Sequence, residues 1–119
     1  MQEQSKLARL KAAFARARVD FDEVLPKLRS GEYQFLEVGD ACAVTHIGVS
    51  GAFRTLYVLA VAGELADVPA LGIRIEEFGR QHGCDCLETD GRLGFERVLQ
   101  QFRADRGYKP VSVKYRKDL

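Results

Sequence analysis

The chain has 119 residues and a formal net charge of +1 at pH 7, with 46% hydrophobic and 29% charged residues. This length and composition are those of one globular domain, and the near-zero charge excludes a whole-chain field that would favour nucleic acid or a membrane surface. There is no run of about 18 apolar residues, so we expect no membrane span, and the polar start lacks the apolar stretch of a secretory signal.

The pattern of residues 1–18 predicts a basic amphipathic helix. Residues 19–119 are predicted to form a single domain. The apolar residues of the segment recur at helical spacing: Leu7, Leu10, Phe14 and Ala17. Basic residues occupy its other faces. This pattern fits either an arm that binds an acidic partner or a solvated helix face, and it leaves open whether the helix packs onto the domain.

A second, shorter helix is expected next, with Asp20 or Asp22 as its cap and Gly31 as its end. Its apolar stripe is Phe21, Val24, Leu25 and Leu28.

Three strands then form a predicted meander over residues 33–38, 41–49 and 53–62. Gly39-Asp40 and Ser50-Gly51 are the two turn signals between them. The stretch 56–62 is apolar on both faces, which is typical of a central strand covered on both sides.

A strand-helix pattern follows the meander. A helix after Asp67 carries its apolar stripe at Val68, Leu71, Ile75 and Phe78 and ends at Gly83. We expect a strand over 84–88, a helix between Gly91 and Gly107, and an edge strand over 110–116. Because a helix joins the strands 53–62 and 84–88, they should run parallel.

The three cysteines predict a reducing compartment. Cys84 and Cys86 lie two apart on one predicted strand face, where their parallel Cβ directions suit a disulfide badly. Together with His82 they do not have the spacing of a zinc knuckle and lack an evident fourth ligand, so we predict no metal.

A meander feeding a β-α-β-α-β unit resembles the GNAT acetyltransferase superfamily, and the C-terminal half resembles the small GNAT-like proteins of phage and prophage genomes. The residues that carry this resemblance are 75–85 (IEEFGRQHGCD), Glu88, 91–99 (GRLGFERVL) and 117–119 (KDL), with 31–45 and 53–56 also fitting. The resemblance covers roughly residues 20–119. It implies an α/β (α+β) fold with N-terminal helices and a mixed sheet.

The resemblance also implies where acetyl-CoA would bind. The pantetheine arm would follow the backbone of one strand: Val58, Leu59, Ala60, Val61, Ala62 and Gly63. In the enzymes a glycine-rich turn with a basic residue then holds the diphosphate on backbone amides. Here the turn has one glycine and no basic residue. It carries Glu64 and Asp67, which we expect to satisfy the following helix themselves, and Pro69 has no N–H to offer.

The resemblance also implies which residues are candidates for catalysis. Glu37, His46 and Glu88 lie on predicted strands near the expected cleft and are candidates for a general base. Many GNAT enzymes protonate the departing thiolate with a tyrosine of the last helix. This chain has none between Gly91 and Gly107, so Tyr108 is the candidate acid.

Two functions follow as hypotheses. The favoured one is a GNAT-fold protein without chemistry that serves as a phage structural or assembly module, binding other phage or host proteins in the bacterial cytoplasm or in the virion. The alternative is an acyl-CoA-dependent N-acetyltransferase with an atypical pocket, in which amides near the end of the strand 56–62 stabilise the reacting oxyanion. The pattern determines neither the oligomeric state nor the acceptor.

Overall fold

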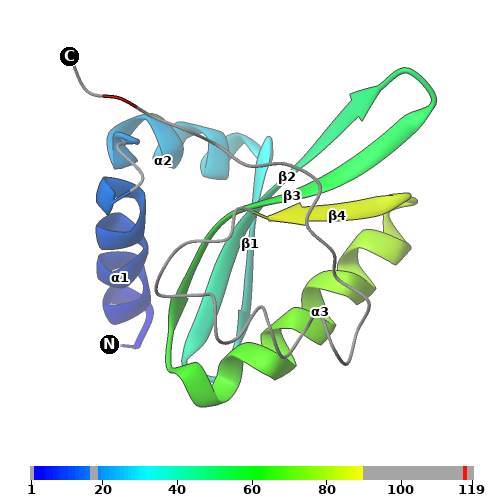
Figure 1. Ribbon diagram of the computed structural model, residues 1–119. Helices are drawn as coiled ribbons and strands as arrows, with labels where there is room; N and C mark the ends of the chain where they lie inside the picture. The colour runs from blue at the N-terminus through cyan, green and yellow to red at the C-terminus, as the bar shows by residue number, and fades with distance from the viewer. Residues whose placement is uncertain (1, 17–18, 90–116, 118–119) are drawn as a thin grey trace.

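The computed structural model describes residues 2–16, 19–89 and 117, with helices and strands arranged as in Figure 1. The elements in chain order are α1 (Gln2–Arg16), α2 (Phe21–Ser30), β1 (Tyr33–Val38), β2 (Ala41–Ser50), β3 (Phe53–Gly63), a short 3-10 helix (Leu65–Asp67), α3 (Val68–Gln81) and β4 (Cys86–Thr89). No described helix has the length and apolar character needed to cross a membrane.

The described strands form one sheet in the order β1-β2-β3-β4. The pairs β1–β2 and β2–β3 are antiparallel, and β3–β4 is parallel. The predicted meander and the parallel crossover through α3 are confirmed, and β3 has a strand on each side as the apolar run 56–62 indicated.

Local signals explain where α2 lies. Asp20 caps it by accepting a hydrogen bond from the Asp22 amide at 2.9 Å, and Gly31 ends it in the left-handed region at φ 84°. Both expectations for this helix are confirmed.

Two predicted boundaries are wrong. The β2–β3 turn lies at Gly51-Ala52 rather than Ser50-Gly51, so β2 extends to Ser50. The last described strand covers Cys86–Thr89 rather than 84–88, because Cys84 still packs against the core beside α3. The helix and strand predicted beyond Thr89 lie outside the described residues.

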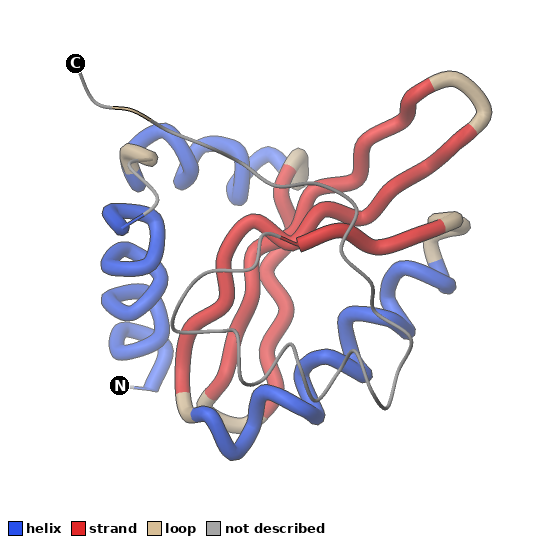
Figure 2. The backbone as a smooth tube through the Cα atoms, viewed as in Figure 1, coloured by secondary structure: helices blue, strands red, loops and turns tan. Residues whose placement is uncertain are grey.

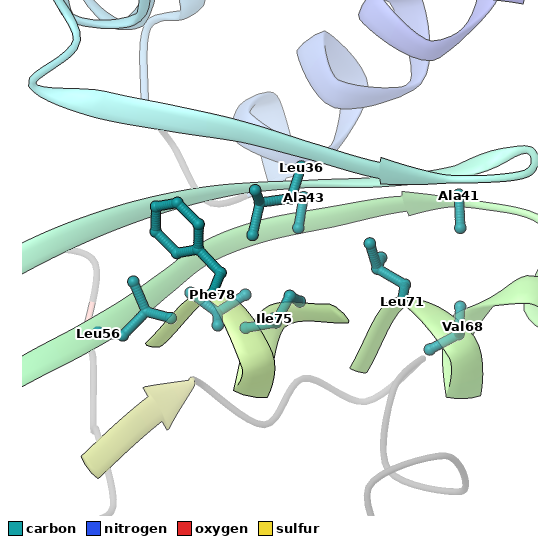
Figure 3. Close-up of a cluster of buried hydrophobic side chains, with 9 residues drawn as sticks. Leu36, Ala41, Ala43, Leu56, Val68, Leu71, Ile75 and Phe78 are labelled. Atoms are coloured by element: carbon teal, nitrogen blue, oxygen red, sulfur yellow. The ribbon is translucent and has the colours of Figure 1, made fainter. Parts of the chain in front are cut away.

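One face of the sheet packs against α3. Its buried cluster is Leu36, Ala41, Ala43, Leu56, Val58, Val68, Leu71, Ile75 and Phe78, most of which are labelled in Figure 3. The predicted stripe of α3 faces inward in full. Gly79 lets the helix approach closely, because a Cβ there would lie 3.3 Å from Leu56 Cδ2.

The other face packs against α1 and α2, which lie on the opposite side of the sheet from α3 (Figure 2). Its buried cluster is Leu10, Ala13, Phe14, Val24, Cys42, Val44, Ala60 and Ala62. The N-terminal helix is therefore part of the packed domain rather than a detached arm.

The β2–β3 hairpin extends past β1, projecting to the upper right in Figure 1. Tyr33, the first residue of β1, pairs with His46, so on β2 the residues from Ile47 onward pair, among the described strands, with β3 alone. At the tip Val49 and Phe53 are 66% and 67% exposed.

Candidate functional site

The central strand β3 contains a β-bulge at Leu59. Val44 of β2 pairs with Ala60, whereas the next residue, Thr45, pairs with Val58, so Leu59 has no partner in β2. A bulge of this kind bends the strand and redirects backbone groups, and such bulges are frequent beside active sites. The sequence gives no sign of this bulge, because no polar residue within the run 56–62 marks the point where the side chains change from one face of the sheet to the other.

The bulge directly follows Val58, which pairs in parallel with Thr89, the last residue of β4 that the structure describes. Among the described residues no strand pairs with β3 beyond that point on the side away from β2, although β3 continues to Gly63. The six residues predicted to bind pantetheine begin at Val58 and follow this edge of β3. No described strand takes up its backbone N–H and C=O groups there, and groups at such an edge can pair with a ligand.

The turn after β3 uses much of its own hydrogen-bonding capacity. Gly63 has φ 118°, and a Cβ there would collide with the Asp40 carbonyl, so only glycine fits. The Glu64 amide donates to the Asp40 carbonyl at 3.3 Å, and the Asp67 amide donates to the Glu64 carbonyl at 3.0 Å. Neither amide points freely at an incoming anion.

The acidic residues of this turn differ from expectation. Asp67 precedes α3 but makes no side-chain hydrogen bond to it. Its carboxylate instead accepts from the Asp40 amide at 3.0 Å and lies against Gly39 of the β1–β2 turn. The expectation that Asp67 caps its own helix is therefore wrong, because the neighbouring hairpin presents an amide donor that the sequence order does not reveal.

A basic residue does reach the turn, from α1. Arg9 forms an ion pair with Glu64 at 3.1 Å, and the two side chains are 43% and 60% exposed. The turn's own residues contain no such cation, and 55 positions of sequence separate the two partners.

A row of polar and aromatic side chains crosses the sheet beside the bulge. Strand register places Tyr33 opposite His46, His46 opposite Tyr57, and Tyr57 opposite Glu88. Register partners share a face of the sheet, and this face is the one that α1 and α2 cover at its other end. Two of the predicted bases, His46 and Glu88, therefore lie in one row, one register position on either side of Tyr57.

The His46 ring is held by its neighbours. Its centroid lies 5.3 Å from that of Tyr33, edge-on, and 6.3 Å from that of Tyr57, stacked. Its Nδ1 lies 3.3 Å from the Glu32 carbonyl oxygen. Because a carbonyl only accepts, Nδ1 carries the proton, and the neutral ring then has a free lone pair on Nε2. This tautomer is suited to a general base.

The Tyr57 ring occupies the space that a side chain at position 48 of β2 would need. A Cβ at Gly48 would lie 2.7 Å from Tyr57 Cε2, so the ring leans across the backbone of β2. Gly48 thereby allows Tyr57 to stack beside His46.

Lys27 of α2 ends the row on the β1 side. Its Nζ donates to the Tyr33 hydroxyl at 3.4 Å and lies 5.1 Å from the centroid of that ring. The hydrogen bond to Tyr33, the charge of Tyr33 and then that of Glu32 raise the pKa of Lys27.

The remaining sequence candidates are placed elsewhere. Glu37 lies on β1 opposite Cys42, four positions from Tyr33 and so about 13 Å along the strand, and it does not join the row. Tyr108 lies outside the described residues. His82 ends α3: its Nδ1 is 2.9 Å from the Phe78 carbonyl oxygen and its ring packs on Phe78.

The cysteines serve no described metal site. Within the described part of the chain no group of three or more metal-ligating side chains occurs, and Cys84 and Cys86 are free thiols. Cys86 lies 3.3 Å from the Thr55 hydroxyl.

Sequence reasoning missed Arg9, Lys27, Tyr33 and Tyr57. The first hairpin turn was placed correctly, so its register already put Tyr33 opposite His46. The second turn was placed one residue early. That error shifts the pairing by two positions and puts Thr55, rather than Tyr57, opposite His46.

No protein-family model matches this chain, and no curated protein matches its sequence. Solved structures do match it. An aminoglycoside acetyltransferase from an uncultured soil metagenomic sample, in complex with sisomicin, is 10% identical with a TM-score of 0.66, over 97% of this chain and 89% of that one. An acetyltransferase of Trypanosoma brucei is 15% identical with a TM-score of 0.61, over 84% and 78%.

A third match is glucosamine-6-phosphate N-acetyltransferase from Arabidopsis thaliana, 12% identical with a TM-score of 0.59, over 83% of this chain and 76% of that one. At such identities the likeness establishes the fold. The chain is structurally similar to GNAT acetyltransferases, with N-terminal helices and a mixed sheet. The resemblance to the phage subset gains no support from these comparisons and stays a prediction.

Proposed function

We propose that this protein is an acyl-CoA-dependent N-acetyltransferase that binds its acyl donor along the open edge of β3. The observation that carries the proposal is the β-bulge at Leu59 in the central strand, next to the row that contains His46 and Glu88. The structurally similar proteins named above are acetyltransferases, which favours this function over the non-catalytic module.

The edge fits the pantetheine part of the donor. Its amide groups need an extended partner with alternating donors and acceptors. The side of residues 59–63 that faces away from β2, where no described strand pairs, supplies one in the manner of an added strand. An amide redirected by the bulge would donate to the thioester oxygen, where negative charge develops during acyl transfer.

Side chains of the row beside the bulge would take part in the proton transfers that the reaction requires. An acceptor amine must lose a proton as it attacks the thioester carbon, and the departing thiolate must gain one. His46 Nε2 has the lone pair to accept the first proton, since Nδ1 is committed to the Glu32 carbonyl. Glu88 lies in the same row and would attract a cationic amine. Tyr108 remains the predicted donor to the thiolate.

The competing hypothesis is the phage structural or assembly module. It is favoured by the turn after β3, whose Glu64 and Asp67 amides are already bonded within the protein and whose two carboxylates oppose a diphosphate. Under this hypothesis the GNAT-like fold offers its surface to a phage or host protein and binds no CoA.

Calorimetry with acetyl-CoA separates the two hypotheses. A ligand present at a hundred times its dissociation constant should raise the free energy of unfolding by about 2.7 kcal/mol. We expect saturable binding, followed by release of the CoA thiol when an amine is added from a panel of an aminoglycoside, glucosamine 6-phosphate and short peptides. Absence of both binding and thermal stabilisation at millimolar acetyl-CoA would contradict the proposed function.

A further inference from the structure

The ion pair between Arg9 and Glu64 is the one described contact that brings a cation to the turn after β3. Glu64 directly follows Gly63, the last residue of the edge proposed to hold the pantetheine arm. Residues 59–64 span about 17 Å in an extended strand. An acyl donor with its thioester at Leu59 would therefore bring its diphosphate close to Glu64 and its partner.

Arg9 is positioned by the core rather than by the ion pair. It is next in sequence to Leu10, which is fully buried against β2 and β3 with Ala13 and Phe14. Loss of its contact with Glu64 would leave α1 in place, so the guanidinium is free to exchange one anion for another.

A carboxylate and a phosphate are alternative ligands for the same guanidinium. Arginine binds both through paired N–H donors. The present partner is held weakly, since both side chains are about half exposed and exposed ion pairs contribute little net stability. A diphosphate carries more charge than a carboxylate and would compete effectively for Arg9.

We propose that Arg9 binds the diphosphate of the acyl donor, and that Glu64 occupies Arg9 in the free protein as an internal substitute for that group. This inference rests on the proposed function. It assigns to α1 the basic residue that the turn itself lacks, and it makes Glu64 a competitor that moves aside when the donor binds.

The test compares the binding of CoA and of pantetheine, which lacks the phosphates, to four proteins: wild type, Arg9→Gln, Glu64→Gln and the double variant. We expect Arg9→Gln to weaken CoA binding about tenfold and Glu64→Gln to strengthen it about threefold, from the loss or release of one charge-assisted contact. Pantetheine binding should not change. Both effects should shrink as salt is raised.

Matched controls carry the same charge changes elsewhere. Lys11→Gln alters the next exposed cation of α1, and Glu77→Gln alters an exposed acid of α3. Neither should change the affinity for CoA by more than about twofold, because Lys11, two positions from Arg9, lies on a different face of α1, and Glu77 lies about 15 Å along α3 from Asp67.

The double variant distinguishes competition from plain repulsion. If Glu64 acts through Arg9, Glu64→Gln should strengthen CoA binding less in the Arg9→Gln background than in the wild type. An equal gain in both backgrounds would overturn the competitor role. If the wild type binds CoA but Arg9→Gln binds it equally well, this inference is wrong and the proposed function survives. If no variant binds CoA or pantetheine, both fail.

Discussion

The two faces of the sheet differ in how completely helices cover them. The face under α3 is mostly apolar: its buried cluster includes Leu36 and Phe78, and the buried hydroxyl of Thr45 donates a hydrogen bond to Gln34 at 3.1 Å. The opposite face is apolar only where α1 and α2 pack, around Cys42 and Ala60. The same face carries the row formed by Tyr33, His46, Tyr57 and Glu88, which begins at Tyr33 beside the α1/α2 cluster.

Because of this difference, alternate residues of the same strand have different roles. On β3, Leu56 and Val58 point into the α3 core, while Tyr57 between them belongs to the polar row. The α3 face therefore contributes mainly to stability, whereas the other face combines a buried cluster with a polar row that is available for chemistry. Substitutions on the two faces should separate these properties.

The largest effect on stability is expected from Leu56→Ala on the α3 face. Leu56 is fully buried, so its truncation should lower the free energy of unfolding by about 3 kcal/mol through lost burial and a cavity. Denaturant unfolding measures this. Phe53→Ala, at a side chain that is 67% exposed on the same strand, should cost less than about 0.5 kcal/mol; equal losses would mean that the α3 face is not the main core.

On the other face, His46→Gln should reduce acetyl transfer about a hundredfold, since positioned general bases contribute at least that factor. Its unfolding free energy should stay within about 0.5 kcal/mol of the wild type, because the ring is only partly buried. His82→Gln is the matched control: it removes the histidine that ends α3 and should lower stability rather than turnover. Unchanged turnover in His46→Gln would remove His46 from the mechanism.

Gly48→Ala tests whether the Tyr57 ring is held in place from β2. The added Cβ would approach Tyr57 Cε2 to 2.7 Å, so the ring must move, at a cost of about 1 kcal/mol. A double-mutant cycle with Tyr57→Ala checks the cause, because the alanine at 48 should cost nothing once the ring is gone. Additive losses would show that the ring and Gly48 are not coupled.

An effect as small as that of Gly48→Ala is expected from Asp67→Ala, which removes the contact between the start of α3 and the β1–β2 turn. Loss of the hydrogen bond from the Asp40 amide should cost about 1 kcal/mol. Hydrogen exchange should speed up at the Asp40 amide and stay unchanged in the first turn of α3. Faster exchange in the first turn of α3, with no change at the Asp40 amide, would instead indicate that Asp67 caps the helix.

Local patterns predicted most of the described fold. Gly31, the Gly39-Asp40 turn and the stripe of α3 each depend on neighbours within a few positions, and each is confirmed. The second hairpin turn was misplaced by one residue because Ser50-Gly51 and Gly51-Ala52 are similar turn signals.

The candidate site was harder to predict, because it depends on distant partners. His46 and Glu88 were identified by residue type, yet their common row follows from the register of three strand pairs. The bulge at Leu59 leaves no mark in a run of apolar residues. Arg9 reaches Glu64, and Asp67 reaches Asp40, only after helix and sheet have packed.

The most direct test of the central claim is a titration with acetyl-CoA monitored by the backbone amide resonances of the full chain. The account predicts saturable shifts that are largest at residues 59–64 of β3 and the turn, with the hairpin tip around Val49 and Phe53 unchanged. Saturable shifts centred elsewhere, or none at millimolar acetyl-CoA, would contradict a donor site on the open edge of β3.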